Sequence, residues 1–174
     1  MMKMFVAGVA AVSLSVASSP VWAQHAGHDH ASHAQSPGAD RQAVVAERGS
    51  AVMPFDLARS THVFTLTNTG GVQTVVSDDG DADQVSAIRG HLSVEAASFA
   101  RGDFSSPAAI HGADMPGLAQ LQQSAGRIDV RYEDVAHGGQ ITFTTEDRAL
   151  KTALRQWFEA QISDHGSHAS HGGE

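Results

Sequence analysis

The chain has 174 residues, a formal net charge of −8 and no cysteine. An acidic chain without a basic run makes nucleic acid and anionic lipid poor partners. The lack of cysteine excludes disulfides, thiolate metal ligands and a thiol nucleophile. Any bound metal must therefore be held by His, Asp, Glu, Met or backbone oxygen.

The N-terminal residues are typical of a secretory signal peptide. Lys3 precedes the apolar run 4–12, and small residues follow up to Ala23. Serines and Pro20 interrupt this run before the roughly 18 apolar residues that a membrane span needs. We therefore predict a signal peptide over 1–23 that is cleaved after Ala23, a periplasmic location, and no membrane span after processing.

The processed chain is expected to form a single domain between two polar ends. Residues 24–47 are rich in His, Ala, Gly, Ser and Gln and show no apolar period, which predicts a disordered leader. We expect the folded domain over 48–163 and a His-rich C-terminal tail over 164–174. The processed length is ordinary for one domain with its own core.

The first half of the domain is predicted to be a hairpin followed by a helix. β-branched residues predict strands at 62–67 and 72–76. Asp81 is the expected N-cap of the helix, with Gln84 three residues later, and Gly102 is the expected end. The apolar positions that should face the sheet are Val85, Ile88, Leu92, Ala96 and Phe99.

The same pattern returns in the second half. Strands are predicted at 128–132 and 140–144, followed by a helix over 146–162 with Thr145 as its cap. Glycine pairs occupy equivalent turns, which suggests an internal strand, strand, helix repeat. The predicted fold class is α+β: a two-layer sandwich with a four-stranded antiparallel sheet and helices on one face.

Seven of the eleven histidines lie in the two polar ends of the chain. Neutral imidazole is a good ligand for copper, zinc and nickel, and a flexible segment with several histidines can surround one ion. The alternative is that these are solvated ends without a metal-binding role. The residues proposed here as metal ligands are His25, His28, His30, His33, His165, His168 and His171.

Three of the four histidines within the predicted domain are further candidate ligands. His62 shares strand parity with the core residues of its strand, and His91 lies beside the apolar stripe of the first helix. His111 and Met115 lie in a Gly- and Pro-rich loop that is suited to display binding groups. If His62, His91 and His111 converge, His165 would supply a fourth ligand of a zinc or copper(II) site.

Each of these residues also has a structural interpretation. Boundary histidines commonly form hydrogen bonds to the backbone, and Met115 would fill a gap in the core. Should Met53 or Met115 lie close to the histidines, the soft thioether would favour copper(I). The sequence leaves these alternatives open.

Together these patterns favour a periplasmic protein that binds copper or zinc, with nickel as a third candidate. It would act as a buffer, chaperone or homeostasis accessory, with a metalloprotein or transporter as its partner and with capture by the tails feeding a folded site. One alternative is a small enzyme with an acid and base pair, either His111 with Asp114 or Asp164 with His165. The other is a module that binds a protein or a non-metal ligand on the open face of the sheet.

Several segments also resemble a known group of proteins. The chain resembles small exported proteobacterial proteins that are often labelled aspartate carbamoyltransferase, a label that implies an enzyme. The label implies a larger two-domain α/β enzyme in which a Ser-x-Arg-Thr-Arg loop binds carbamoyl phosphate. This sequence has no such loop. The resemblance therefore transfers no functional residue. The segments that carry it are 53–57, 61–64, 70–73, 110–118, 157–161 and 164–166.

Overall fold

A computed structural model describes residues 37–173. The predicted signal peptide, and the predicted leader up to residue 36, lie outside the described residues. The described elements, in chain order, are α1 (Pro37–Val52), η1 (Leu57–Arg59), β1 (Ser60–Thr67), β2 (Gly70–Ser77), α2 (Ala82–Ala100), α3 (Ser105–His111), α4 (Leu118–Gln122), β3 (Asp129–Val135), β4 (Gly138–Thr144), α5 (Arg148–His165), η2 (Gly166–His168) and β5 (Ala169–His171).

The strands form one sheet in the order β3-β4-β2-β1-β5. The four predicted strands are β1 to β4, and all their pairings are antiparallel. The prediction of a four-stranded antiparallel sheet was nevertheless incomplete. A fifth strand, β5, pairs in parallel with β1 at the sheet edge, so the sheet is mixed. The α+β class is confirmed.

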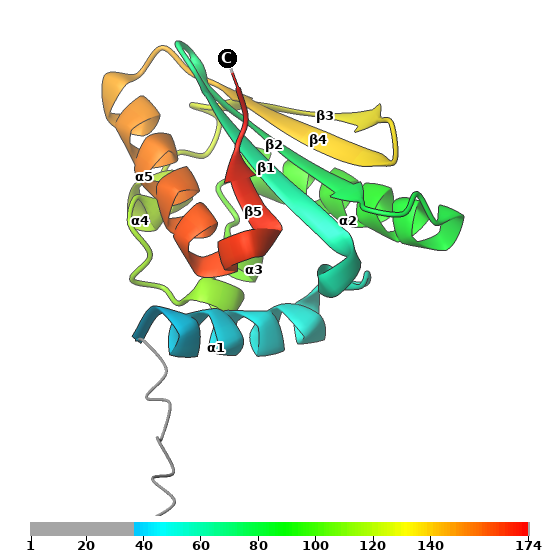
Figure 1. The fold of residues 1–174 in the computed structure, drawn as a ribbon. Helices are drawn as coiled ribbons and strands as arrows, with labels where there is room; N and C mark the ends of the chain where they lie inside the picture. Colours follow the sequence, from blue (N-terminus) through cyan, green and yellow to red (C-terminus); the bar gives the residue numbers. More distant parts are fainter. Residues whose placement is uncertain (1–36, 174) are drawn as a thin grey trace, which may run out of the picture. The chain divides into compact units, whose positions relative to one another are not determined.

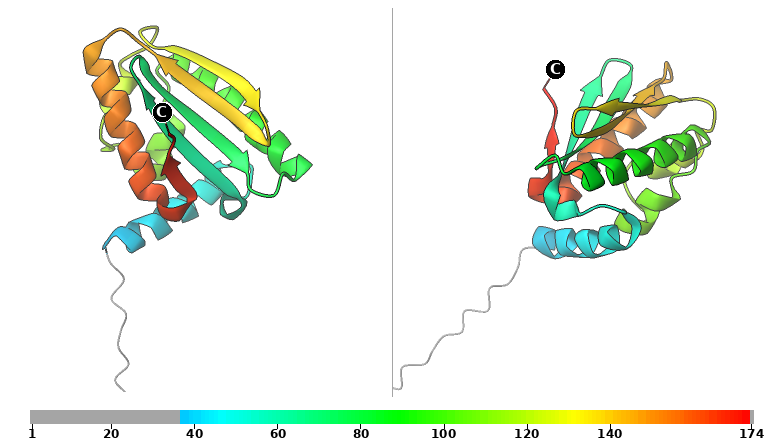
Figure 2. Two further views of the ribbon diagram at one scale, coloured as in Figure 1. Left: turned by 45° about the horizontal axis from the view of Figure 1, so that its top comes forward. Right: turned by 90° about the vertical axis from the view of Figure 1, so that its right-hand side faces the viewer.

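The helices cover one face of this sheet (Figures 1 and 2). Side chains of β2 and β4 alternate between buried and partly exposed, as expected for strands with one covered face. α2 packs on β3 and β4, and α5 packs on β2, β1 and β5. α1 runs along one end of the molecule, against α3 and α5 (Figure 1). The core between the layers includes Phe64, Val75, Ile88, Ile141, Phe143, Leu154, Trp157 and Phe158.

The strand, strand, helix pattern occurs twice, and the two hairpins meet at the centre of the sheet. The inner strands of the two hairpins are β2 and β4, which pair with each other. The first residue of β2, Gly70, is paired with the last residue of β4, Thr144, and the first residue of β4, Gly138, is paired with Val76 near the end of β2. A Cβ atom on Gly70 would lie 2.1 Å from the Phe143 carbonyl oxygen, and one on Gly138 would lie 1.9 Å from that of Val75. Glycine is therefore required at both positions by close approach of the backbones.

The predicted ends of α2 are confirmed, but the predicted cap of α5 is not. Asp81 caps α2 and accepts a hydrogen bond from the Gln84 backbone N–H at 2.9 Å, as predicted. Gly102 follows the helix with a φ of 78°, in the left-handed region that favours glycine. The predicted cap of α5 was wrong. Asp147, and not Thr145, accepts from the first turn of that helix.

Both predicted tails contain ordered structure. The leader predicted over 24–47 overlaps α1, which begins at Pro37. The tail predicted over 164–174 begins inside α5, and η2 and β5 follow it. The folded unit is thus longer at both ends than the predicted 48–163. Among the described helices, none combines the length and apolar character needed to cross a membrane.

Candidate functional site

A pocket lies between the sheet and the end of the molecule that α1 covers. Its volume is about 30 Å³, enough for one or two water molecules or a metal ion. Its residues come from β1, β2, α2, α3, the end of α5 and the segment after α1. The polar and sulfur-containing side chains that line it are Met53, His62, Gln73, His91, Glu95, Ser106, His111, Gln161 and His165.

His62 and His111 are equally enclosed, and His62 is the histidine that β1 contributes to the pocket. It lies on the covered face of β1 with only 2 % of its surface exposed, as its strand parity predicted. Neither ring nitrogen has a hydrogen-bond partner among residues 37–173. Burial, reinforced by nearby His165 and His111, lowers the pKa of His62 well below its ordinary value. The ring is therefore neutral and carries an unused lone pair inside the protein.

His165 joins His62 to His111. It is the last residue of α5, and its ring centroid lies 4.8 Å from that of His62 in a stacked arrangement. The His111 ring centroid lies 5.0 Å from that of His165, nearly edge-on. Burial, with a smaller contribution from His111, lowers the pKa of His165 to about 4. Three imidazoles thus form a contiguous cluster, which we call the histidine cluster: His62, His111 and His165.

A carboxylate and a guanidinium fix the orientation of His111. The His111 Nδ1 atom lies 2.9 Å from Asp164 Oδ2, and both side chains are almost fully buried. Arg41 of α1 donates to both oxygens of Asp164, and it also donates to the His111 carbonyl oxygen at 3.0 Å. Because Nδ1 faces the carboxylate, Nε2 is the nitrogen of His111 left for a ligand.

Burial and hydrogen bonding shift the pKa values of His111 and Asp164 in opposite directions. Burial lowers the pKa of His111, and the bond to Asp164 partly offsets that effect. Burial raises the pKa of Asp164, but the hydrogen bonds from Arg41 and His111 outweigh it, so the net shift is downward. Asp164 is therefore an ionised acceptor that holds His111 in one orientation.

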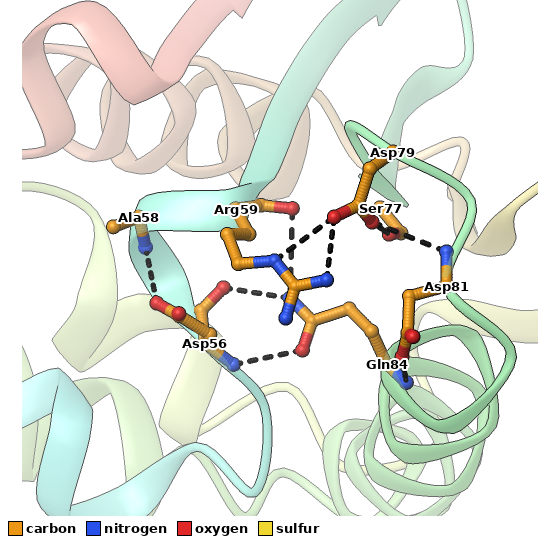
Figure 3. Close-up of polar contacts among 7 residues, drawn as sticks. All are labelled: Asp56, Ala58, Arg59, Ser77, Asp79, Asp81 and Gln84. Atoms are coloured by element: carbon orange, nitrogen blue, oxygen red, sulfur yellow. Dashed lines mark hydrogen bonds and ion pairs between the residues drawn. The ribbon is translucent and has the colours of Figure 1, made fainter.

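The segment after α1 carries Met53 and Phe55 to the pocket. The Gln84 side chain accepts from the Asp56 backbone N–H at 3.0 Å and donates to the Asp56 carbonyl at 2.7 Å, which fixes this segment to α2 (Figure 3). The Phe55 ring lies near both His62 and His91, at centroid distances of 6.3 and 5.8 Å.

The same region is braced from the other side of η1. Arg59 donates to Asp79 at 2.9 Å, and Asp79 also accepts from Ser77 at 2.8 Å (Figure 3). These bonds join the end of η1, just before β1, to the turn between β2 and α2.

Sequence reasoning missed four polar residues of the pocket: Gln73, Glu95, Ser106 and Gln161. Gln73 on β2, Glu95 on α2 and Gln161 on α5 are buried, and among the described residues the Oε1 atoms of both glutamines have no partner. A signal was present in each case, since a polar residue falls where the apolar period predicts a core position. Arg41 was missed because it lies in a segment predicted to be disordered.

The predicted ligands divide into three groups. His62, His91, His111 and His165 line the same pocket. Within the described residues, however, no ring contact joins His91 to the other three. His168 of η2 and His171 of β5 are ordered and exposed. Four of the predicted ligands lie outside the described residues: His25, His28, His30 and His33.

Met115 does not lie at the pocket. Its side chain is 4 % exposed and packs in the apolar core, which corrects the prediction that it is a ligand. Met53 lines the pocket instead. The predicted pairings of His111 with Asp114 and of Asp164 with His165 are also wrong, because Asp164 pairs with His111.

In the described part of the chain, the histidine side chains do not surround a single metal position. Over residues 37–173, no group of three or more His, Asp or Glu side chains is placed to hold a metal ion. Two of the rings, those of His62 and His165, are stacked on one another with an interplanar angle of 30°. The donor types fit a copper or zinc ion, but binding requires at least one ring to turn.

Comparison with known proteins adds no assignment to this pocket. No family model, no curated protein and no solved structure matches the chain. The resemblance to the group labelled aspartate carbamoyltransferase therefore remains a prediction, and the function must be argued from the residues themselves.

Proposed function

We propose that this protein binds a transition-metal ion, copper or zinc, at the histidine cluster, and that it serves as a periplasmic metal buffer or chaperone. The histidines near the ends of the chain collect ions, and the pocket retains one of them. A metalloprotein or transporter is the proposed recipient.

The observation that carries this proposal is the state of His62. A buried imidazole with both nitrogens unpartnered is destabilising, because each lost hydrogen bond leaves a desolvation cost of about 1–3 kcal/mol. A metal ion bound to one nitrogen would offset part of this cost. The His165 ring stacks on it and the His111 ring contacts that of His165, so one ion can reach several nitrogen ligands after a side-chain rotation.

The surroundings of His111 fit the same proposal. Metal-ligating histidines commonly donate their second ring N–H to a carboxylate, which fixes the tautomer and raises the basicity of the ligating nitrogen. Asp164, held by Arg41, occupies that place for His111. In addition, His168 lies close enough for its charge to act on His62 and His165, so an exposed histidine stands near the pocket.

The test is to count tightly bound ions in matched variants of the full chain. Equilibrium dialysis against buffered free Zn(II), or anaerobically against buffered Cu(I), gives the number of ions retained. The pocket variant is His111→Gln with His165→Gln. The control is His168→Gln with His171→Gln, which changes the same number of histidines in exposed positions. We expect the pocket variant to lose one tightly bound ion and the control to retain it.

Repeating the dialysis near pH 5.5 tests binding in the pocket further, because an unperturbed imidazole is mostly protonated at that pH and then binds metal weakly. Binding in the pocket should persist, since the pKa of His165 is about 4. Circular dichroism shows whether each variant is folded. Equal ion counts in the folded pocket variant and the wild-type chain would refute the proposal.

A second candidate is acid–base catalysis by His111. The Asp164 carboxylate 2.9 Å from Nδ1 is the arrangement that orients a general base. Ser106, the hydroxyl residue among the described pocket-lining residues, donates to Glu95 at 2.8 Å and not to His111. This candidate predicts that the ion count is the same in wild type and the pocket variant.

A further inference from the structure

The charges at the pocket limit the ion that it can take. Glu95 is the one carboxylate among the described residues that line it, and one of its oxygens already accepts from Ser106. Asp164 stands behind His111, and its charge is matched by Arg41. At most one uncompensated negative charge therefore faces the pocket. A monovalent ion would be neutralised by it, whereas a divalent ion would leave a net positive charge in a buried place.

Burial makes that difference in charge important. The walls around the histidines are largely apolar and include Phe55, Val75, Leu92, Phe99 and Ile110. The cost of moving an ion from water into such surroundings is large and rises with the square of its charge. A pocket of about 30 Å³ also leaves little room for the water ligands that a divalent ion would bring with it.

The donor atoms point in the same direction. The sulfur of Met53 is a soft thioether on a segment without regular secondary structure between α1 and η1, and its side chain is partly exposed at the pocket. Thioether sulfur selects copper(I) over harder divalent ions, and imidazole nitrogen is compatible with both. An unbranched methionine side chain can also turn toward a neighbouring ion with little strain.

We propose that the pocket selects monovalent copper, Cu(I), over Zn(II), and that Met53 determines this selectivity as a soft ligand beside the histidine cluster. This inference rests on the proposed metal-binding function. It goes beyond that proposal by assigning the oxidation state of the ion and a residue outside the histidine set.

The experiment compares two methionine substitutions in the full chain under anaerobic conditions. Cu(I) affinity is measured by competition with a chromophoric Cu(I) chelator, Ag(I) serves as a redox-inert substitute, and Zn(II) affinity is measured with a zinc chelator. The test variant is Met53→Leu. Met115→Leu is the matched control, because Met115 has the same side chain but lies in the core away from the pocket.

Wild type is expected to bind Cu(I) and Ag(I) at least about tenfold more tightly than Zn(II). Met53→Leu should lower Cu(I) and Ag(I) affinity about tenfold and leave Zn(II) affinity unchanged, and Met115→Leu should change neither. Tighter binding of Zn(II), or equal Cu(I) affinity in wild type and Met53→Leu, would overturn the selectivity. If ions bind but His111→Gln with His165→Gln loses none, the proposed function itself fails, which is a different outcome.

Discussion

The two ends of the covered sheet face have opposite chemistry. At one end Phe104, Phe143 and Trp157 pack with Phe99, which also borders the pocket, with ring centroids 4.6 to 5.9 Å apart. At the other end the same layer holds His62, Gln73 and Gln161, whose side chains contain four buried unpartnered polar atoms. At the aromatic end, the one buried polar side-chain atom without a hydrogen-bond partner among the described residues is the Trp157 indole nitrogen.

The two ends therefore differ in what they contribute: one stabilises the fold, and the other holds the proposed binding site. The aromatic end buries large apolar surfaces, and such burial is the main favourable contribution to folding. The pocket end keeps polar groups without partners, which opposes folding. We infer that the aromatic end supplies the stability that allows the pocket end to keep its ligands unpaired.

The largest effect is expected from truncation at the aromatic end. Phe143 is fully buried and contacts three other aromatic rings. Phe143→Ala should lower the free energy of unfolding by about 3–5 kcal/mol, because it removes apolar contacts and leaves a cavity. Urea unfolding followed by circular dichroism measures this change. A loss below about 1 kcal/mol would mean that this end does not dominate stability.

Lowering the pH should weaken the fold through the pocket end. The pKa of His165 is about 4 in the folded chain and about 6.5 when unfolded, so between these values the unfolded chain binds the extra proton. The free energy of unfolding should therefore decrease as pH falls from 6.5 to 4, by up to about 1.4 kcal/mol per pH unit for each histidine kept neutral.

Two neighbouring carboxyl groups act differently in this pH range. Burial raises the pKa of Glu95, which opposes the decrease. The lowered pKa of Asp164 has its effect only nearer pH 4 and below, where its stabilising contribution is lost. Urea unfolding at several pH values, compared between wild type and His165→Gln, isolates the histidine contribution. An equally steep dependence in His165→Gln would contradict the assignment to His165.

A smaller effect is expected from the carboxylate behind His111. Asp164→Asn should weaken metal binding about 10- to 100-fold, because it removes the charge that orients His111. Asp114→Asn is the matched control, since Asp114 also lies near Arg41 but does not bond His111. Affinity is measured by chelator competition. Equal loss in both variants would assign the effect to general electrostatics.

The smallest expected effect has the opposite sign. His62→Leu replaces a buried ring with two unpartnered nitrogens by an apolar side chain of similar size. It should raise the free energy of unfolding of the metal-free protein by about 1 kcal/mol and weaken metal binding. Chemical unfolding and dialysis of the same sample measure both effects. Destabilisation of the metal-free variant would show that His62 is a structural residue.

The sequence predicted the parts of the fold that local signals determine. The two hairpins, the Asp81 cap and the buried side of β1 at His62 follow from strand alternation and capping chemistry. α1 could not be found in this way, because only Val45 and Gly49 among its described side-chain positions are buried. β5 is a three-residue strand whose pairing with β1 is set by the chain that precedes it.

The site was predictable in its residue types and not in its geometry. Strand parity and helical period predicted the positions of His62 and His91 near the covered face, whereas tertiary packing brings His111 and His165 to the same pocket. The pairing of His111 with Asp164 depends on contact between α3 and α5, which are far apart in sequence. Tertiary packing likewise determines that Met53, and not Met115, lies at the pocket.

The most direct test of metal binding at the histidine cluster is nitrogen NMR of the imidazole rings in the full chain. Diamagnetic Zn(II) or Ag(I) is added to one equivalent at neutral pH. We predict that the first equivalent shifts the ring nitrogens of His62 and His165. Shifts confined to histidines outside the pocket, with the His62 ring unchanged, would contradict the account.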